Sequence, residues 1–283
     1  MARRRVSRKR IALRRATALA VVGLVVAAVV LAVSGGRAAG GDAGSLTTEP
    51  CRAVTTTHTT RAPGAVSAYA SRQGRAIDAR SFGESGPSVL VLAGLHGDEP
   101  EGVRLAEELM RRLAACGDGD LGNRVVVVPR VNPDGLAAGT RKNAVGVDVN
   151  RNFAAEDFGQ GEAGEPAGRY FGGAAPVSEP ETRMILDMVA RLEPVMIVAL
   201  HAPLACVNYD GPAGEQAAAL AAAAGLTLEP DLGYDTPGSL GTYFGDERGI
   251  PVITMELAPG ENDWDRLADA LLALVAGQTL GNT

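Results

Sequence analysis

The chain has 283 residues, of which 46% are hydrophobic and 21% charged, and its formal net charge at pH 7 is −6. This composition supplies enough apolar residues for a buried core, in one large domain or two small ones, and it excludes a disordered chain. Eight of the 27 basic residues precede residue 16, which leaves 19 basic against 33 acidic residues for the rest. An acidic body lacks the basic face that phosphate backbones require, so we expect no nucleic-acid partner.

The N-terminus combines a basic run with an apolar run. Residues 1–15 hold the eight basic residues and no acidic one, and residues 16–33 contain no charge at all. Because positive residues stay on the cytoplasmic side, this pattern predicts a single-pass signal anchor in the cell membrane, with the rest of the chain outside. The alternative is cleavage after Ala38 or Ala39, which would release a secreted protein, but the apolar run is long for a cleaved signal peptide.

A linker and one folded domain follow this segment. Residues 34–66 are rich in Gly, Thr and Pro and lack hydrophobic periodicity, so they predict a flexible tether. Residues 67–283 alternate short apolar runs with helical patterns, which predicts a helix-covered, largely parallel sheet. The expected elements, in chain order, are strand 88–93, helix 100–115, strand 124–129, helix 179–192, strand 195–200, helix 214–224, strand 252–257 and helix 263–276.

Two helix starts carry capping signals. Ser178 with Glu181 fits a capping box at the helix that begins near residue 179, and Asn262 fits an N-cap for the last helix. We therefore expect Ser178 and Asn262 to accept hydrogen bonds from the first backbone N–H groups of these helices.

Several common enzyme motifs are missing from the sequence. It contains no G-x-S-x-G elbow, no P-loop and no H-E-x-x-H, which argues against serine hydrolases, P-loop NTPases and the commonest zinc proteases. Its three cysteines, Cys51, Cys116 and Cys206, lack C-x-x-C spacing and cannot form a structural zinc site alone. In an exported chain any two of them could pair, and the sequence leaves all three pairings open.

The positions of two histidines point to a metal. His96 and His201 each come directly after an apolar run that predicts a buried strand, and Glu99 lies three residues after His96. Ligands bind at the carboxyl ends of strands in such sheets, so both rings should reach the same edge. Two histidines and one glutamate with an open fourth position form a catalytic zinc arrangement. The alternative is that both are loop histidines bonded to backbone groups.

Further charged residues lie in comparable places. Arg141, Asn150 and Arg151 fall in a segment without helical or strand periodicity, and arginine beside an amide donor suits recognition of a free carboxylate. Surface ion pairs would explain the same arginines in an acidic protein. Glu256 ends the apolar run 252–255, so its carboxylate should be partly buried at the same sheet edge, with a raised pKa.

These segments together resemble the zinc carboxypeptidase family. The motifs are HGDE at 96–99, NPDG at 132–135, GVDVNRNF at 146–153, the strand-terminal His201 and the ITMEL run that contains Glu256. SEPET at 178–182, HAPLAC at 201–206 and GYDTPGSLG at 233–241 resemble the murein peptide amidase branch, which cuts the bond between γ-D-glutamate and meso-diaminopimelate in cell-wall peptides. The resemblance implies a three-layer αβα sandwich with a mixed, largely parallel central sheet. It also implies one Zn²⁺ ion and a murein peptide or another small peptide as substrate.

The resemblance also implies a role for individual residues. His96, Glu99 and His201 would bind the zinc ion, Glu256 would act as general base and then acid, and Arg141 would stabilise the oxyanion. Asp148 would accept a hydrogen bond from the other ring N–H of His96. Asn150 and Arg151 would bind the substrate carboxylate. Tyr234 would cover the substrate, and Leu240 with Gly241 would line the specificity pocket.

The far end of diaminopimelate carries an amino and a carboxyl group that Leu240 and Gly241 cannot bind. The loop 154–173 and the region of Asp210 are the candidates for these contacts. Two other functions stay open at this point. One is a related zinc deacylase or carboxypeptidase acting on small acyl-amino acids or other peptides. The other is a wall-binding module that kept the fold and lost the chemistry.

Overall fold

The computed structural model divides the chain into two units, residues 1–48 and residues 49–283. The structure describes residues 64–65, 69–117 and 120–277, all of which belong to the second unit. The predicted basic segment, the predicted signal anchor, most of the predicted linker and Cys51 therefore lie outside the described residues. Among the residues that are described, no helix is long and apolar enough to cross a membrane.

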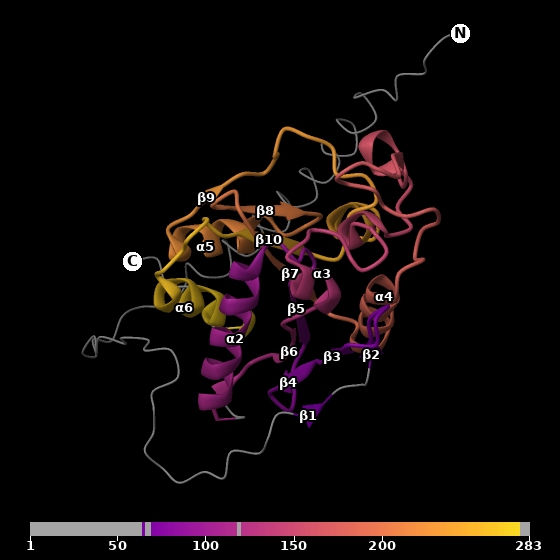
Figure 1. Ribbon diagram of the computed structural model, residues 1–283. Helices are drawn as coiled ribbons and strands as arrows, with labels where there is room; N and C mark the ends of the chain where they lie inside the picture. Colours follow the sequence, from indigo (N-terminus) through magenta and orange to yellow (C-terminus); the bar gives the residue numbers. More distant parts are fainter. Residues whose placement is uncertain (1–63, 66–68, 118–119, 278–283) are drawn as a thin grey trace, which may run out of the picture. The chain divides into compact units, whose positions relative to one another are not determined.

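A mixed eight-stranded sheet forms the centre of this unit (Figure 1). Its strands, in spatial order, are β1 (Gly64–Ala65), β4 (Arg80–Phe82), β6 (Arg124–Val128), β5 (Ser88–Ala93), β7 (Met196–His201), β10 (Val252–Glu256), β8 (Cys206–Asp210) and β9 (Thr227–Leu228). The four central strands β6, β5, β7 and β10 run parallel. The pairs β1–β4, β4–β6 and β8–β10 are antiparallel, whereas the edge strand β9 pairs in parallel with β8. A separate hairpin pairs β2 (Tyr69–Ala70) with β3 (Ala76–Ile77).

Helices cover both faces of the sheet (Figure 1). On one face lie α2 (Pro100–Ala115), α5 (Gly214–Ala224) and α6 (Trp264–Val275). The other face packs against α4 (Pro180–Leu192), the 3-10 turn η2 (Val149–Arg151) and the π-helix η4 (Gly241–Asp246). The short helix α3 (Pro133–Ala138) and the 3-10 turn η3 (Gly161–Gly164) lie in the connections.

Alternation along the strands produces these two cores. In β5, Val89 and Val91 join the core under α2, while Leu90 and Leu92 join the core under α4, and all four side chains are fully buried. A strand with both faces covered needs apolar residues at every position, and β5 has them from Val89 onward. The three-layer αβα sandwich with a mixed, largely parallel sheet is therefore confirmed.

The helix starts differ from the capping predictions. Glu179, rather than Ser178, is the N-cap of α4, and Ser178 donates its hydroxyl hydrogen bond to the Glu179 carboxylate at 2.7 Å. Pro180 occupies the first helical position, where its fixed φ sets the start of the helix. At α6 the cap is Asp263, whose carboxylate accepts from the Arg266 N–H at 3.3 Å, so the prediction for Asn262 was wrong by one residue.

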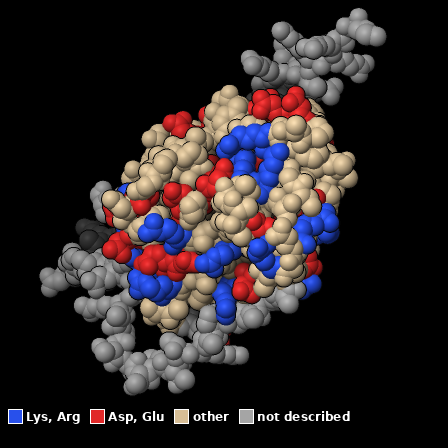
Figure 2. Space-filling view, viewed as in Figure 1, with Lys and Arg blue, Asp and Glu red and all other residues tan. Residues whose placement is uncertain are grey.

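The sheet begins slightly before the predicted domain start. Strand β1 at Gly64–Ala65 pairs with β4, although it falls within the segment 34–66 predicted as a linker. On the surface, acidic and basic side chains alternate over α2 and α6 (Figure 2). Arg112 of α2 pairs with Glu108 in its own helix at 2.9 Å and with Asp265 of α6 at 2.5 Å. Such exposed pairs each contribute about 1 kcal/mol or less, so the buried cores dominate the stability.

Candidate active site

Three neighbouring parallel strands deliver the central polar residues of the site. His96 lies three residues after the end of β5, whereas His201 is the last residue of β7 and Glu256 the last of β10. In the register of the sheet Glu256 lies opposite His201, and the Leu257 N–H donates to the His201 carbonyl at 2.8 Å. The carboxyl ends of these strands therefore bring two imidazoles and a carboxylate to one edge, as the sequence predicted.

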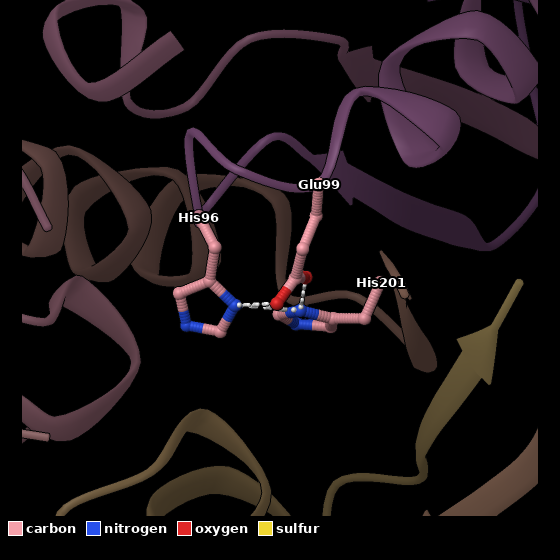
Figure 3. A group of neighbouring side chains, drawn as sticks. All are labelled: His96, Glu99 and His201. Atoms are coloured by element: carbon pink, nitrogen blue, oxygen red, sulfur yellow. Dashed lines mark hydrogen bonds and ion pairs between the residues drawn. The ribbon is translucent and has the colours of Figure 1, made fainter. Parts of the chain in front are cut away.

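His96, Glu99 and His201 point at one another (Figure 3). Nδ1 of His96 lies 2.8 Å from Oε1 of Glu99, Nδ1 of His201 lies 2.8 Å from Oε2, and the two Nδ1 atoms are 3.1 Å apart. All three side chains are buried, and they form the one group in the described part of the chain that could hold a metal ion.

The donor set fits zinc. Ligands 2.0–2.1 Å from a tetrahedral ion lie about 3.3 Å from one another, close to the separations seen here. The two Nδ1 atoms and the Glu99 carboxylate oxygens can all act as hydrogen-bond acceptors, and they face one another. A cation between them would interact favourably with all of their lone pairs. Burial opposes ionisation of Glu99, but His96 and His201 hold the pKa of this carboxyl well below its usual range. Glu99 is thus kept in the anionic form that a metal ligand needs.

Close backbone contacts hold the Glu99 loop in place. Glu99 precedes Pro100 at the start of α2, and the Ala202 N–H donates to Glu99 Oε2 at 3.3 Å. A Cβ atom at Gly97 would lie 1.9 Å from the carbonyl carbon of Gly135, and one at Gly102 would lie 2.6 Å from the carbonyl oxygen of Leu200. Only glycine lets the loop and the first turn of α2 approach this closely.

Asp148 contacts the ring nitrogen of His96 that faces away from Glu99 and His201. Nε2 of His96 lies 3.1 Å from Oδ1 of Asp148, which is completely buried. Asp148 also accepts hydrogen bonds from the Asn150 N–H at 3.0 Å and from Arg141 Nε at 2.8 Å. Burial opposes the ionised form of Asp148, but His96 and Arg141 hold its pKa well below the usual range. A carboxylate in this position fixes the ring so that Nδ1 faces the metal position. For His201, the corresponding atom Nε2 is buried without a hydrogen-bond partner among the described residues.

Arg141 lies between two carboxylates. Its Nη1 donates to Glu99 at 3.2 Å while its Nε donates to Asp148. Arg141 therefore pairs with acidic residues, but inside the site, so the surface ion pairs given as the alternative do not describe it. The guanidinium also lies over the ring of Tyr170, 5.1 Å from its centroid.

Arg151 differs from Arg141 because, within the described part of the chain, it forms no salt bridge with a carboxylate. Its side chain is 5% exposed, its Nη1 donates to the Asn150 carbonyl at 2.7 Å, and it makes no salt bridge within the described residues. Burial lowers the pKa of Arg151, and the charge of Arg141 adds to this effect while Asp148 opposes it. The Asn150 side-chain oxygen accepts from the Leu240 N–H at 2.9 Å, which turns the amide toward the same region. A buried cation beside an amide is prepared for an incoming carboxylate.

One cavity of about 410 Å³ unites these groups. It is lined by ten of the eleven residues to which the resemblance gave a role, whereas Asp148 lies behind it. The ten are His96, Glu99, Arg141, Asn150, Arg151, His201, Tyr234, Leu240, Gly241 and Glu256. Glu256 is buried on the cavity wall, where burial and the nearby Glu99 raise its pKa. Tyr234 is 53% exposed and Leu240 is almost completely buried. Tyr170 also lines the cavity; only its loop, 154–173, could be named from the sequence, because the loop is irregular and its side-chain positions follow no periodicity.

Comparison with known proteins agrees with this site. The zinc carboxypeptidase family profile matches residues 52–227. The chain belongs to the zinc carboxypeptidase family. It is accordingly a hydrolase that uses one zinc ion, and His96, Glu99 and His201 provide the group that fits it.

Murein peptide amidases are among the proteins that this chain resembles. Murein peptide amidase A of Escherichia coli K12 is 39% identical over 184 residues, which cover 62% of this chain and 73% of the relative. The enzyme of the same name from Vibrio campbellii is 33% identical over 68% of this chain and 79% of its own. The crystal structure of the murein-tripeptide amidase of Escherichia coli O157 matches with a TM-score of 0.61 and 32% identity, covering 77% of this chain and 92% of that one.

Proposed function

We propose that this protein hydrolyses the bond between γ-D-glutamate and meso-diaminopimelate in murein peptides. The observation that carries the proposal is the buried Arg151, which makes no salt bridge within the described residues and lies in the same cavity as the metal-binding group and Glu256. A substrate carboxylate bound there would place the adjoining peptide bond near these residues. Relatives that are murein peptide amidases support the choice of substrate.

Each residue of the site has a role in this proposal. His96, Glu99 and His201 hold the zinc ion, and Asp148 keeps the His96 ring oriented. Bound zinc would supply a Lewis acid that polarises the scissile carbonyl. Glu256 takes a proton from the attacking water and delivers it to the leaving amine, a task for which its raised pKa suits it.

The other residues position the substrate. Arg151 and the Asn150 amide bind the carboxylate next to the scissile bond, and Arg141 stabilises negative charge that develops on the carbonyl oxygen. Tyr234, half-exposed on the cavity wall, covers the bound substrate, and Leu240 lines the pocket for the departing residue.

A competition between substrates tests this function. Purified protein with zinc should release diaminopimelate from L-Ala-γ-D-Glu-meso-diaminopimelate at least 10²-fold faster than it deacylates N-acetyl amino acids. The reverse preference would favour the related zinc deacylases. Zinc binding without hydrolysis of either substrate would favour a wall-binding module, although the complete set of metal-binding and acid–base side chains argues against that function.

We also propose that residues 16–33 anchor the protein in the cell membrane and that the catalytic domain lies outside. The eight basic residues before this apolar run support the orientation. Cys116 is disulfide-bonded, whereas Cys206 is free and buried. A disulfide is typical of proteins that leave the reducing cytoplasm, so it supports export.

A further inference from the structure

The cavity contains a further carboxylate that the proposed reaction does not use. Asp210 is the last residue of β8, and it lines the same cavity as Arg151 and Glu256. It also lines an adjoining cavity, which shares Arg151 and Tyr234 with the first. The two cavities therefore meet at a region with a cation on one wall and a carboxylate on another.

The π-helix η4 makes room for this carboxylate. A Cβ atom at Gly241 would lie 2.0 Å from Asp210 Oδ2, and one at Gly245 would lie 2.5 Å from Asp210 Cβ. Asp210 thus packs directly against two glycines of η4, and any larger residue at either position would displace it. The carboxylate has a fixed place beside Leu240 in the pocket for the departing residue.

Asp210 has no charged partner of opposite sign in the part of the chain that the structure describes. Within the described residues no Lys or Arg pairs with its carboxylate, and no side chain or backbone group donates a hydrogen bond to it. Burial and the neighbouring Asp246 raise its pKa to about 6. A half-buried carboxylate beside another acid is stabilised when a cation arrives, and the cavity is where that cation would enter.

We propose that Asp210 is a specificity-determining residue that accepts a hydrogen bond from a charged amino group on the side chain of the departing residue. The inference rests on the proposed function, because Arg151 must hold the carboxylate of the same residue. A residue with a carboxylate near the scissile bond and an amino group at the end of its side chain can pair with Arg151 through the first group and with Asp210 through the second. Diaminopimelate and lysine carry this amino group on the same side-chain carbon, whereas norleucine has the same chain without it.

Three peptides of the form L-Ala-γ-D-Glu-X, with X as meso-diaminopimelate, L-lysine or L-norleucine, test the inference. The full-length, zinc-loaded protein should show a kcat/KM for the lysine peptide at least about tenfold above that for the norleucine peptide, as expected for a charged hydrogen bond. Asp210→Asn should bring the lysine value down to the norleucine value and leave norleucine cleavage unchanged or faster. An unchanged ratio of lysine to norleucine cleavage in this variant would overturn the proposal.

Two controls keep the result interpretable. Asp235→Asn removes an exposed carboxylate from the adjoining cavity but not from the active-site cavity, so it should leave the ratio unchanged. Asp210→Ser gives a smaller neutral side chain in case asparagine fits poorly against Gly241, and zinc content together with norleucine cleavage reports whether each variant is folded.

A binding measurement separates this inference from the proposed function. If the wild-type protein cleaves none of the three peptides, the proposed function fails. Calorimetric titration with free meso-diaminopimelate and free norleucine then still tests Asp210. Tighter binding of diaminopimelate by at least about tenfold, lost in Asp210→Asn, would support the role, and equal binding of the two amino acids would refute it.

Discussion

Glu256 and Arg151 have different tasks within one cavity, and their surroundings explain why. Glu256 is a buried carboxyl close to another acid, so its pKa is raised and it can exchange a proton during the reaction. Arg151 is a buried cation without an acidic partner among the described residues, so it is suited to bind an anion. Substituting each residue should therefore affect catalysis and binding differently.

The variant Glu256→Gln keeps the shape of the side chain but cannot accept a proton. We expect kcat to fall by about 10²- to 10⁴-fold while the zinc content stays at that of the wild type. Steady-state kinetics with metal analysis checks this. A variant with near wild-type kcat would show that Glu256 is only structural.

The variant Arg151→Ala should bind substrates that have a free carboxylate next to the scissile bond more weakly than the wild type does. We expect kcat/KM to fall by about 10²-fold, mostly through KM, because a buried charge pair is lost. Converting the carboxylate of the substrate to an amide should have a similar effect on the wild type and little further effect on the variant. Arg169→Ala is the matched control, because Arg169 lies on the same cavity wall but is exposed and pairs with Asp98. If the variant still preferred the free carboxylate over the amide, the role of Arg151 would be wrong.

At the scale of elements, the sequence predicted the centre of the fold better than its periphery. Strand β5 and helices α2 and α5 have the predicted bounds, because uniform apolar runs and helical periodicity mark elements that are buried by their neighbours. Strand β8 was not predicted. Its residues Cys206–Asp210 mix apolar and polar types, and pairing with β10 makes them a strand. No element was predicted for the residues of η4, so the fixed place of Asp210 became apparent only in three dimensions.

Some residues of the site could likewise be predicted from the sequence, and others could not. Strand-end positions predicted that His96, His201 and Glu256 would converge, because the edge of a parallel sheet is set by topology. Tyr170, which lies under both Arg141 and Arg151, could not be predicted. It lies in a loop without periodicity, where contacts distant in sequence decide the position of each side chain.

Helix α2 packs on β7 so closely that a methyl group should disturb the site. In Gly102→Ala the new Cβ would lie 2.6 Å from the Leu200 carbonyl oxygen, so α2 must shift away from the strand that ends in His201. We expect a loss of about 1–3 kcal/mol in the free energy of unfolding, a melting temperature several degrees lower and weaker zinc binding. Gly214→Ala at the start of α5 is the control, since it meets only the Tyr209 side chain at 3.3 Å. Equal melting temperatures and zinc affinities for the two variants would contradict this packing argument.

At the scale of the whole molecule, the N-terminal sequence decides where the enzyme would meet its substrate. Residues 1–33 carry the pattern of a signal anchor, and a linker of about thirty residues could span roughly 30 Å as a flexible coil. This reach would let the active site act on peptides in or near the cell wall. A catalytic domain inside the cell would instead act on wall fragments that had been taken up.

Protease accessibility distinguishes the two locations. Protease added to intact cells whose wall has been removed should degrade the catalytic domain, because the domain is expected outside the membrane. A cytoplasmic protein should survive the same treatment, and a known surface protein should be digested. Complete protection of the catalytic domain under these conditions would refute export.

The central claim is that one zinc ion held by His96, Glu99 and His201 is required for release of diaminopimelate. The most direct test measures zinc content and diaminopimelate release in parallel, for the wild type and for His201→Ala. We expect one zinc per wild-type chain, loss of release on chelation and recovery when zinc is restored. In His201→Ala the two remaining ligands should hold the metal poorly, and release should be absent. A full zinc complement in this variant, or release by the zinc-free wild type, would contradict the account.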